Sequence, residues 1–114
     1  MSVVRHSREN GMNAKEVQEL VKEAIGNRWG QSNAHGVNIQ TCLVTPEKRT
    51  YVHPINGESI ELWLVLEEDP KDQKGYKIVF NEADQQFGLA ITEISGISAY
   101  LGPYGTFMET LESM

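Results

Sequence analysis

The stretch IELWLVLEED, residues 60–69, is an alternating apolar run that ends in three acidic residues. Successive side chains of a β-strand point to opposite faces, so the even-numbered residues from Ile60 to Leu66 share one face. The other face carries Trp63 and Val65 between glutamates, so it is not fully solvated. The pattern predicts a central strand that is partly covered on both sides.

A second strand is expected to return beside the first, because the stretch YKIVFNEA, residues 76–83, also alternates. The antiparallel register that matches both faces pairs Leu66 with Ile78, Val65 with Val79, Leu64 with Phe80 and Glu67 with Lys77. Leu64 and Phe80 would then face the core together, while Glu67 would lie in water. A slip of two residues keeps the same faces, so the individual pairs stay open. The acids at 67–69 are interpreted as the solvated end of a strand.

An amphipathic helix is expected near the N-terminus. Asn13 and Glu16 have the spacing of a capping box, and apolar residues follow at helical spacing from Val17 to Ile25. Gly26 then provides a typical helix C-terminus.

The other elements are expected from turn residues and short alternating runs. Before the first long strand we expect a loop at 26–36, a strand at 37–45, a turn at 46–49, an edge strand at 50–55 and a hairpin turn at Asn56-Gly57. After the second long strand we expect a strand at 87–94, a loop at 95–105 and a short helix capped by Thr106. The prediction is an α+β fold: a mostly antiparallel sheet of four to five strands, with an N-terminal amphipathic helix and a short C-terminal helix covering one face.

The chain has 114 residues, which suits one domain. Residues 1–12 show no periodicity and are interpreted as a flexible arm, and residues 13–114 as a single α+β domain. No apolar run approaches the roughly 18 residues that span a membrane, and the N-terminus has no hydrophobic signal region. We therefore expect a cytoplasmic protein without a membrane partner.

Charge excludes one class of partner and favours another. The chain has 16 acidic and 10 basic residues, for a formal charge of −6. Binding a phosphate backbone needs clustered Lys and Arg, whereas the cations here are scattered, so no nucleic-acid partner is expected. The acidic balance favours solubility and a basic protein partner.

No motif for a metal, a cofactor or a nucleophile is found. Cys42 is the only cysteine, which excludes an internal disulfide and a Cys-rich zinc module. The acids at 67–69 lack the spacing of a calcium loop, and the histidines form no H-x-x-x-H or H-x-H pair. We expect no metal ion and no cofactor, and no catalytic residue is assigned. The lack of motifs favours a non-enzyme but leaves an enzyme open.

The three histidines, His6, His35 and His53, keep an alternative open. Histidine is the usual acid or base near neutral pH, so a small hydrolase could use His35 or His53 with nearby carboxylates. A second alternative is a small-ligand-binding domain, whose pocket would open over the small residues Gly88 and Ala90.

The segment AYLGPYGTF, residues 99–107, is the first candidate partner surface. Tyr-rich loops suit protein contacts, and the candidate residues are Tyr100, Pro103 and Tyr104. The loop at 26–36 is the second candidate, through Trp29 and His35. In the opposing interpretation the segment buries its aromatic rings in the core, because a small domain needs them there.

The C-terminal half, with ELWLVLEEDP, GYKIVF, FGLAI and YLGPYGTFMETLESM within residues 58–114, resembles small bacterial domains of unknown function. Some such proteins resemble immunity proteins of toxin systems. The resemblance implies a cytoplasmic bacterial protein and assigns no activity and no site residue. The acidic balance, the small size, the lack of catalytic motifs and the aromatic loop favour a non-enzymatic interaction module that binds or neutralises a basic partner, or a homodimer.

Overall fold

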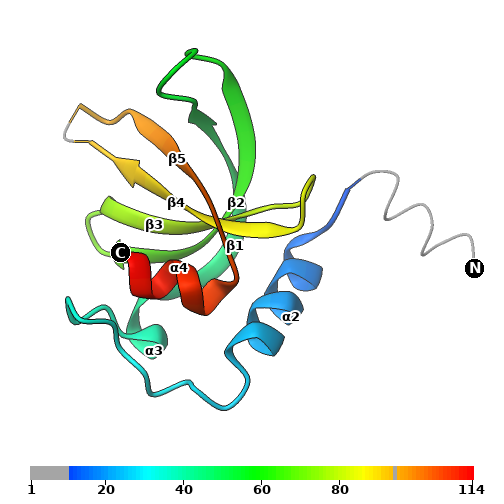
Figure 1. Ribbon diagram of the computed structural model, residues 1–114, viewed down its shortest axis with the longest axis vertical. Coiled ribbons are helices and arrows are strands. Elements are labelled where there is room, and N and C mark those ends of the chain that lie inside the picture. Colours follow the sequence, from blue (N-terminus) through cyan, green and yellow to red (C-terminus); the bar gives the residue numbers. More distant parts are fainter. Residues whose placement is uncertain (1–10, 94) are drawn as a thin grey trace, which may run out of the picture.

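The computed structural model describes residues 11–93 and 95–114, which form a curled five-stranded sheet with helices gathered on one side (Figure 1). The elements are α2 (Ala14–Ile25), α3 (Ile39–Cys42), β1 (Leu43–Val52), β2 (Ser59–Asp69), β3 (Lys74–Asn81), β4 (Gln86–Thr92), β5 (Ser98–Gly105) and α4 (Phe107–Ser113). This arrangement confirms the predicted α+β class, with an N-terminal helix, a mostly antiparallel sheet and a short C-terminal helix.

Each strand of the sheet pairs with the next strand in the chain, and all of these pairings are antiparallel. In a five-stranded meander the first and last strands run in the same direction, so β1 can meet β5 only as a parallel neighbour. They meet at one pair, Val52 with Ala99, and this contact closes the sheet into a barrel. We call this pair the seam.

The curl divides the hydrophobic core into two layers. The larger layer lies between the sheet and the helices, where Val17 and Val21 of α2 pack with residues such as Trp63 and Phe80. The buried residues of the smaller layer are Tyr51, Leu62, Val79, Ala90 and Tyr100. Each of these is at most 5% exposed although no helix residue belongs to the layer, so they lie inside the barrel.

A β-bulge in β2 changes the predicted register. The observed pairs are Leu66 with Ile78, Glu67 with Lys77, Leu64 with Val79 and Trp63 with Phe80. The first two pairs are as predicted, but the register then shifts between Leu64 and Leu66. Leu64 and Phe80 therefore point to opposite faces, and the prediction that they face the core together is wrong. A bulge inserts one residue into one strand, and simple alternation does not reveal it.

Glu67 is buried, contrary to the prediction that it lies in water. Glu67 and Lys77 are 3% and 1% exposed, and the carboxylate Oε2 lies 2.8 Å from the ammonium Nζ. The ammonium also donates to the carbonyl of Gln73 at 2.9 Å. Lys77 shares its face of β3 with Val79, which lies inside the barrel. The cross-strand pairing was predictable, but the curl that encloses the pair was not.

Three local predictions are also corrected. Instead of a strand at 37–45, the chain first forms α3, because the Asn38 side chain caps it by accepting the amide of Thr41 at 3.3 Å. Instead of a turn at 46–49, β1 continues across a bulge between Leu43 and Glu47. Instead of a loop at 95–105, Ser98–Gly105 forms the last strand.

The helix ends follow the predicted signals. Asn13 with Glu16 and Thr106 with Glu109 both form complete capping boxes, and Gly26 ends α2 with a φ of 61°. Most of the predicted arm lies outside the described residues, and so does His6.

Glu82 links three segments that are distant in the sequence. Its carboxylate accepts the amide of Met12 at 3.2 Å and the indole of Trp63 at 2.8 Å, and Lys48 lies 3.3 Å away. The Lys48 ammonium also lies 5.2 Å from the centre of the Trp63 ring. Burial alone would raise the pKa of Glu82, but these hydrogen bonds and Lys48 outweigh burial and lower it.

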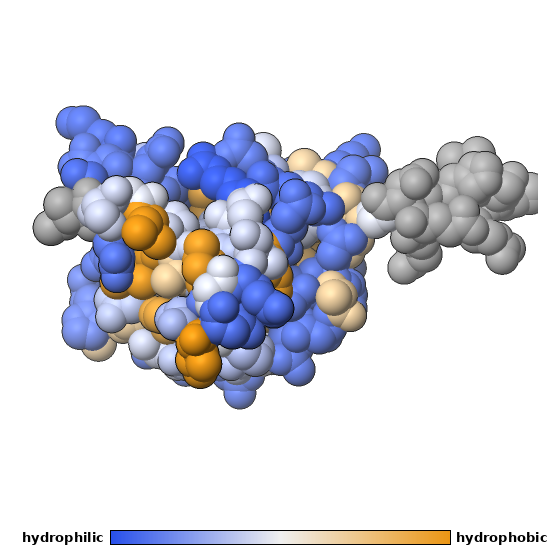
Figure 2. Space-filling view, turned by 90° about the horizontal axis from the view of Figure 1, so that it is seen from above, coloured by the Kyte–Doolittle hydropathy of each residue, from blue (hydrophilic) through white to orange (hydrophobic). Residues whose placement is uncertain are grey.

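Apolar side chains gather on the end of the barrel that is seen from above (Figure 2). This end carries the turn between β1 and β2 and the turn between β4 and β5 (Figure 1). Ile55 in the first turn is 97% exposed, and Ile97 beside the second is 54% exposed. Both turns therefore present an isoleucine to solvent.

We expect Lys77→Met to lower the free energy of unfolding by about 3–5 kcal/mol, because it leaves the Glu67 charge buried without a partner. The double variant Glu67→Met, Lys77→Met should recover most of this loss, because it removes both charges. Urea unfolding followed by tryptophan fluorescence measures the difference. A single variant within about 1 kcal/mol of the wild type would contradict a buried pair.

The pH dependence of stability should include a contribution from Glu82. Because its folded-state pKa is lowered, the stabilisation is present above the unfolded pKa and is lost as the pH falls through the folded pKa. The difference in unfolding free energy between the wild type and Glu82→Gln should therefore shrink between neutral pH and about pH 3. A difference that stays constant over this range would show that Glu82 acts only through packing.

Candidate functional site

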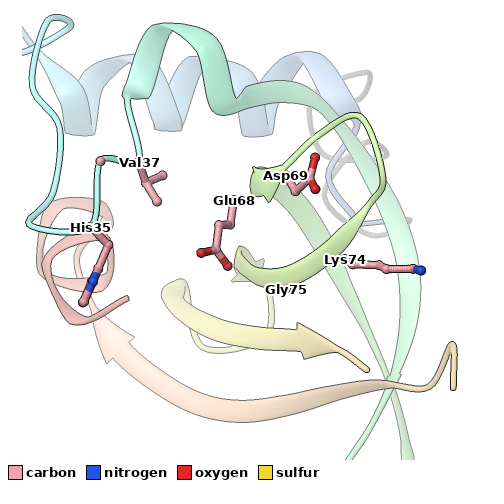
Figure 3. Close-up of a pocket in the computed structure, with 7 residues that line it drawn as sticks. His35, Val37, Glu68, Asp69, Lys74 and Gly75 are labelled. Atoms are coloured by element: carbon pink, nitrogen blue, oxygen red, sulfur yellow. The ribbon is translucent and has the colours of Figure 1, made fainter. Parts of the chain in front are cut away.

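A cleft of about 500 Å³ lies between the loop after α2 and the hairpin of β2 and β3 (Figure 3). Its lining residues are His35, Gly36, Val37, Glu68, Asp69, Lys74 and Gly75. A second hollow of about 390 Å³ shares His35, Val37 and Glu68 and extends to Tyr76, Ser113 and Met114. We call the two hollows together the His35 cleft. Clefts of this volume are large enough for a small molecule or a side chain of a partner.

One wall of the His35 cleft is fixed by Asn33. Its side-chain oxygen accepts the amides of His35 and Val37, both at 2.9 Å, which is the local turn that asparagine favours. Its side-chain nitrogen donates to the carbonyl of Leu111 at 3.1 Å and so ties the loop to α4. The exposed imidazole of His35 is therefore carried by an anchored backbone.

The opposite wall is formed by Glu68. Its Oε1 accepts the amide of Tyr76 at 3.0 Å. Gly75 has a φ of +83°, and a Cβ there would lie 2.6 Å from this oxygen, so a glycine lets the carboxylate come close. Figure 3 shows the Glu68 side chain reaching into the space toward His35, whereas Lys74 points away from it.

The cleft is suited to holding a group that donates hydrogen bonds. Only Oε1 of Glu68 is engaged within the described part of the chain, so Oε2 can accept from an ammonium or a guanidinium group. Between residues 11 and 114, Ile94 excepted, no group of three or more His, Cys, Asp and Glu side chains could hold a metal ion. No hydrogen bond joins His35 to Glu68 in the described structure.

The predicted partner-binding residues do not form one surface. His35 lines the cleft, whereas Trp29 is half-buried against the helix-side core. Pro103 and Tyr104 are exposed on β5, and Tyr100 is only 5% exposed inside the barrel. Tyr100 thus matches the opposing interpretation, in which the segment buries its aromatic ring.

Tyr100 also closes the face at Gly88 and Ala90, where the alternative of a small-ligand-binding domain placed its pocket. A Cβ added to Gly88 would lie 3.0 Å from the Tyr100 ring and would collide with the carbonyl of Gly102. The small residues therefore make room for β5, not for a helix or a ligand. The Tyr100 hydroxyl has no hydrogen-bond partner in the described part of the chain, and burial raises its pKa to about 12. Its ring lies 5.8 Å from that of His53, which is not among the residues that line the His35 cleft.

Sequence reasoning did not identify Glu68 as a site residue, because it assigned residues 67–69 to a solvated strand end. Asn33 and Gly75 were also missed. A local signal existed for Asn33, which stands two residues before His35 in a glycine-rich loop. No local signal places Glu68 opposite His35, since the two are brought together only by the fold.

A comparison with protein families, curated proteins and solved structures finds no match for this chain. None of the helices in the described part of the chain is long and apolar enough to span a bilayer.

Gly75→Ala should cost about 1–2 kcal/mol of stability because of the positive φ, and it should also displace Glu68. Gly57→Ala is the matched control, since Gly57 has a φ of +74° and nothing within 4 Å of an added Cβ. Both variants should lose similar stability in thermal unfolding, but only Gly75→Ala should shift the Tyr76 amide resonance. Equal Tyr76 shifts in both variants would show that Glu68 is not held by this amide.

Proposed function

We propose that this protein is a non-enzymatic interaction module for a basic protein partner, and that the His35 cleft receives a Lys or Arg side chain of that partner. The observation that carries the proposal is the Glu68 carboxylate. One oxygen is anchored by the Tyr76 amide, while the other faces the cleft. A carboxylate held in this way loses little conformational freedom when it binds a cation.

The charge of the whole chain supports the same proposal. The formal charge of −6 favours encounter with a basic protein over encounter with an acidic one. Asp69 and Lys74 also line the cleft, but Figure 3 shows both side chains directed away from His35, so Glu68 is the carboxylate that faces it. A bound basic side chain would therefore meet mainly acceptors. Such binding would neutralise part of the partner's charge.

An arginine-containing tetrapeptide tests the proposal without knowledge of the partner. In an NMR titration it should shift the amides of Gly36, Gly75 and Tyr76, and an acidic tetrapeptide should not. Glu68→Gln should weaken binding by a factor of about 1.4 to 5, since an exposed ion pair contributes about 0.2–1 kcal/mol. Glu61→Gln, an exposed position elsewhere on β2, is the matched control and should bind like the wild type.

Shifts that avoid the cleft, or equal losses of affinity in Glu68→Gln and Glu61→Gln, would refute this assignment.

One observation favours a second candidate: His35 and Glu68 stand on opposite walls of one cleft, as a small hydrolase would need. Hydrolysis of chromogenic esters or phosphates that both His35→Ala and Glu68→Gln abolish would establish that candidate instead. We expect the wild type to hydrolyse such substrates no faster than buffer does.

A further inference from the structure

A second surface lies along α2, away from the His35 cleft. Two adjoining hollows of about 360 and 430 Å³ share Leu20, Glu23 and Gln85. The first is also lined by Ala24, Phe80, Phe87, Gly105, Thr106 and Phe107, and the second by Gly11, Met12, Glu16, Glu19 and Glu82. We call this continuous surface the α2 groove. It needs neither His35 nor Glu68.

The floor of the α2 groove is apolar. Leu20 and Ala24 lie on the side of α2 next to the three buried residues that hold the helix to the sheet. Three aromatic rings complete the floor: the centre of the Phe87 ring lies 4.9 Å from that of Phe80 and 5.7 Å from that of Phe107. Phe87 is 7% exposed, and Phe80 and Phe107 are at most 2% exposed, so the rings form a rigid backing. The apolar surface that a partner can contact comes mainly from the half-buried Leu20 and Ala24.

The rim of the α2 groove is acidic. Glu16, Glu19 and Glu23 follow one another at spacings of three and four along α2, which places them on one side of the helix. No Lys or Arg is among the residues that line either hollow. The groove therefore combines an apolar floor with a single sign of charge along its edge.

Two of these carboxylates are available to a partner. Glu16 is engaged in the capping box with Asn13, and Glu82 is engaged with Trp63 and Lys48. Glu19 lies 4.0 Å from Lys22, and both side chains are at least half exposed, so this contact is weak. Glu23 forms no ion pair with any residue in the described part of the chain.

We infer that the α2 groove binds an amphipathic basic helix of a partner protein. Apolar side chains at spacings of three and four on the partner helix would contact the floor of the groove at Leu20. The Lys or Arg side chains that flank them would face Glu19 and Glu23. This is the helix-in-groove mode of recognition. The charge pattern selects the occupant, because an acidic helix would be repelled by the rim and a purely apolar one would leave it unpaired.

A synthetic peptide of about 15 residues tests the inference, with leucines at helical spacing on one face and lysines beside them. Fluorescence anisotropy of the labelled peptide should show saturable binding that weakens between about 50 mM and about 300 mM NaCl. The double variant Glu19→Lys, Glu23→Lys should raise the Kd at least tenfold. The milder Glu19→Gln, Glu23→Gln should raise it less, and it keeps the test valid if charge reversal disturbs α2.

The matched control is Glu58→Lys, Glu61→Lys, which makes the same change in net charge at two exposed positions near the turn between β1 and β2. Its Kd should stay within twofold of the wild type. Equal losses in the two lysine double variants would overturn the inference, because binding would then depend on net charge alone. A scrambled lysine–leucine peptide that binds as tightly would also overturn it.

Two further measurements distinguish the α2 groove from the His35 cleft and from a homodimer interface. Glu68→Gln should leave binding of the helical peptide unchanged. The proposal for the His35 cleft can therefore be refuted without refuting the proposal for the α2 groove, and the reverse. If the occupant were instead a second copy of this chain, light scattering would detect a dimer that Glu19→Lys, Glu23→Lys dissociates, and the inference of a separate basic partner would fall.

Discussion

The closure of a five-stranded meander is the constraint on which the rest of the structure depends. Each strand pairs with its neighbour in sequence, and the curl continues until the first strand meets the last at Val52 and Ala99. Closure creates an inside that no helix needs to cover, so Tyr51 and Tyr100 are buried by the sheet alone. It also leaves the outer face free to carry the helices. The loop after α2 forms one wall of the His35 cleft, and α2 itself forms one side of the α2 groove.

Local signals in the sequence were sufficient for elements that are decided locally. The capping boxes at Asn13 and Thr106 depend on side chains three residues apart, and both are observed. The pairing of Glu67 with Lys77 was also predictable, because matching charges and matching alternation favoured the same register.

The failures share a different cause. The bulge near Val65 and the burial of Glu67 depend on how far the sheet curls, which is decided by the sum of many contacts. The candidate site depends on the fold as well: His35 was noticed as a loop residue, and Glu68, which is exposed as expected, comes to line the same cleft only through the fold. Alternation indicates which side chains share a face only where no bulge intervenes, and it does not indicate whether that face is inside or outside.

The seam has a consequence for how the native molecule fluctuates. One backbone pair joins β1 to β5, whereas the other neighbouring strands are joined along much of their length. Local opening of the native state should therefore begin at the seam. The amide hydrogens beside Val52 would exchange with solvent sooner than those at the centre of the sheet. Each opening uncovers a row of unpaired donors and acceptors close to the solvent-facing Ile97, which is a template for cross-chain strand addition. The same contact that completes the barrel thus marks where self-association would start when the protein is heated or concentrated.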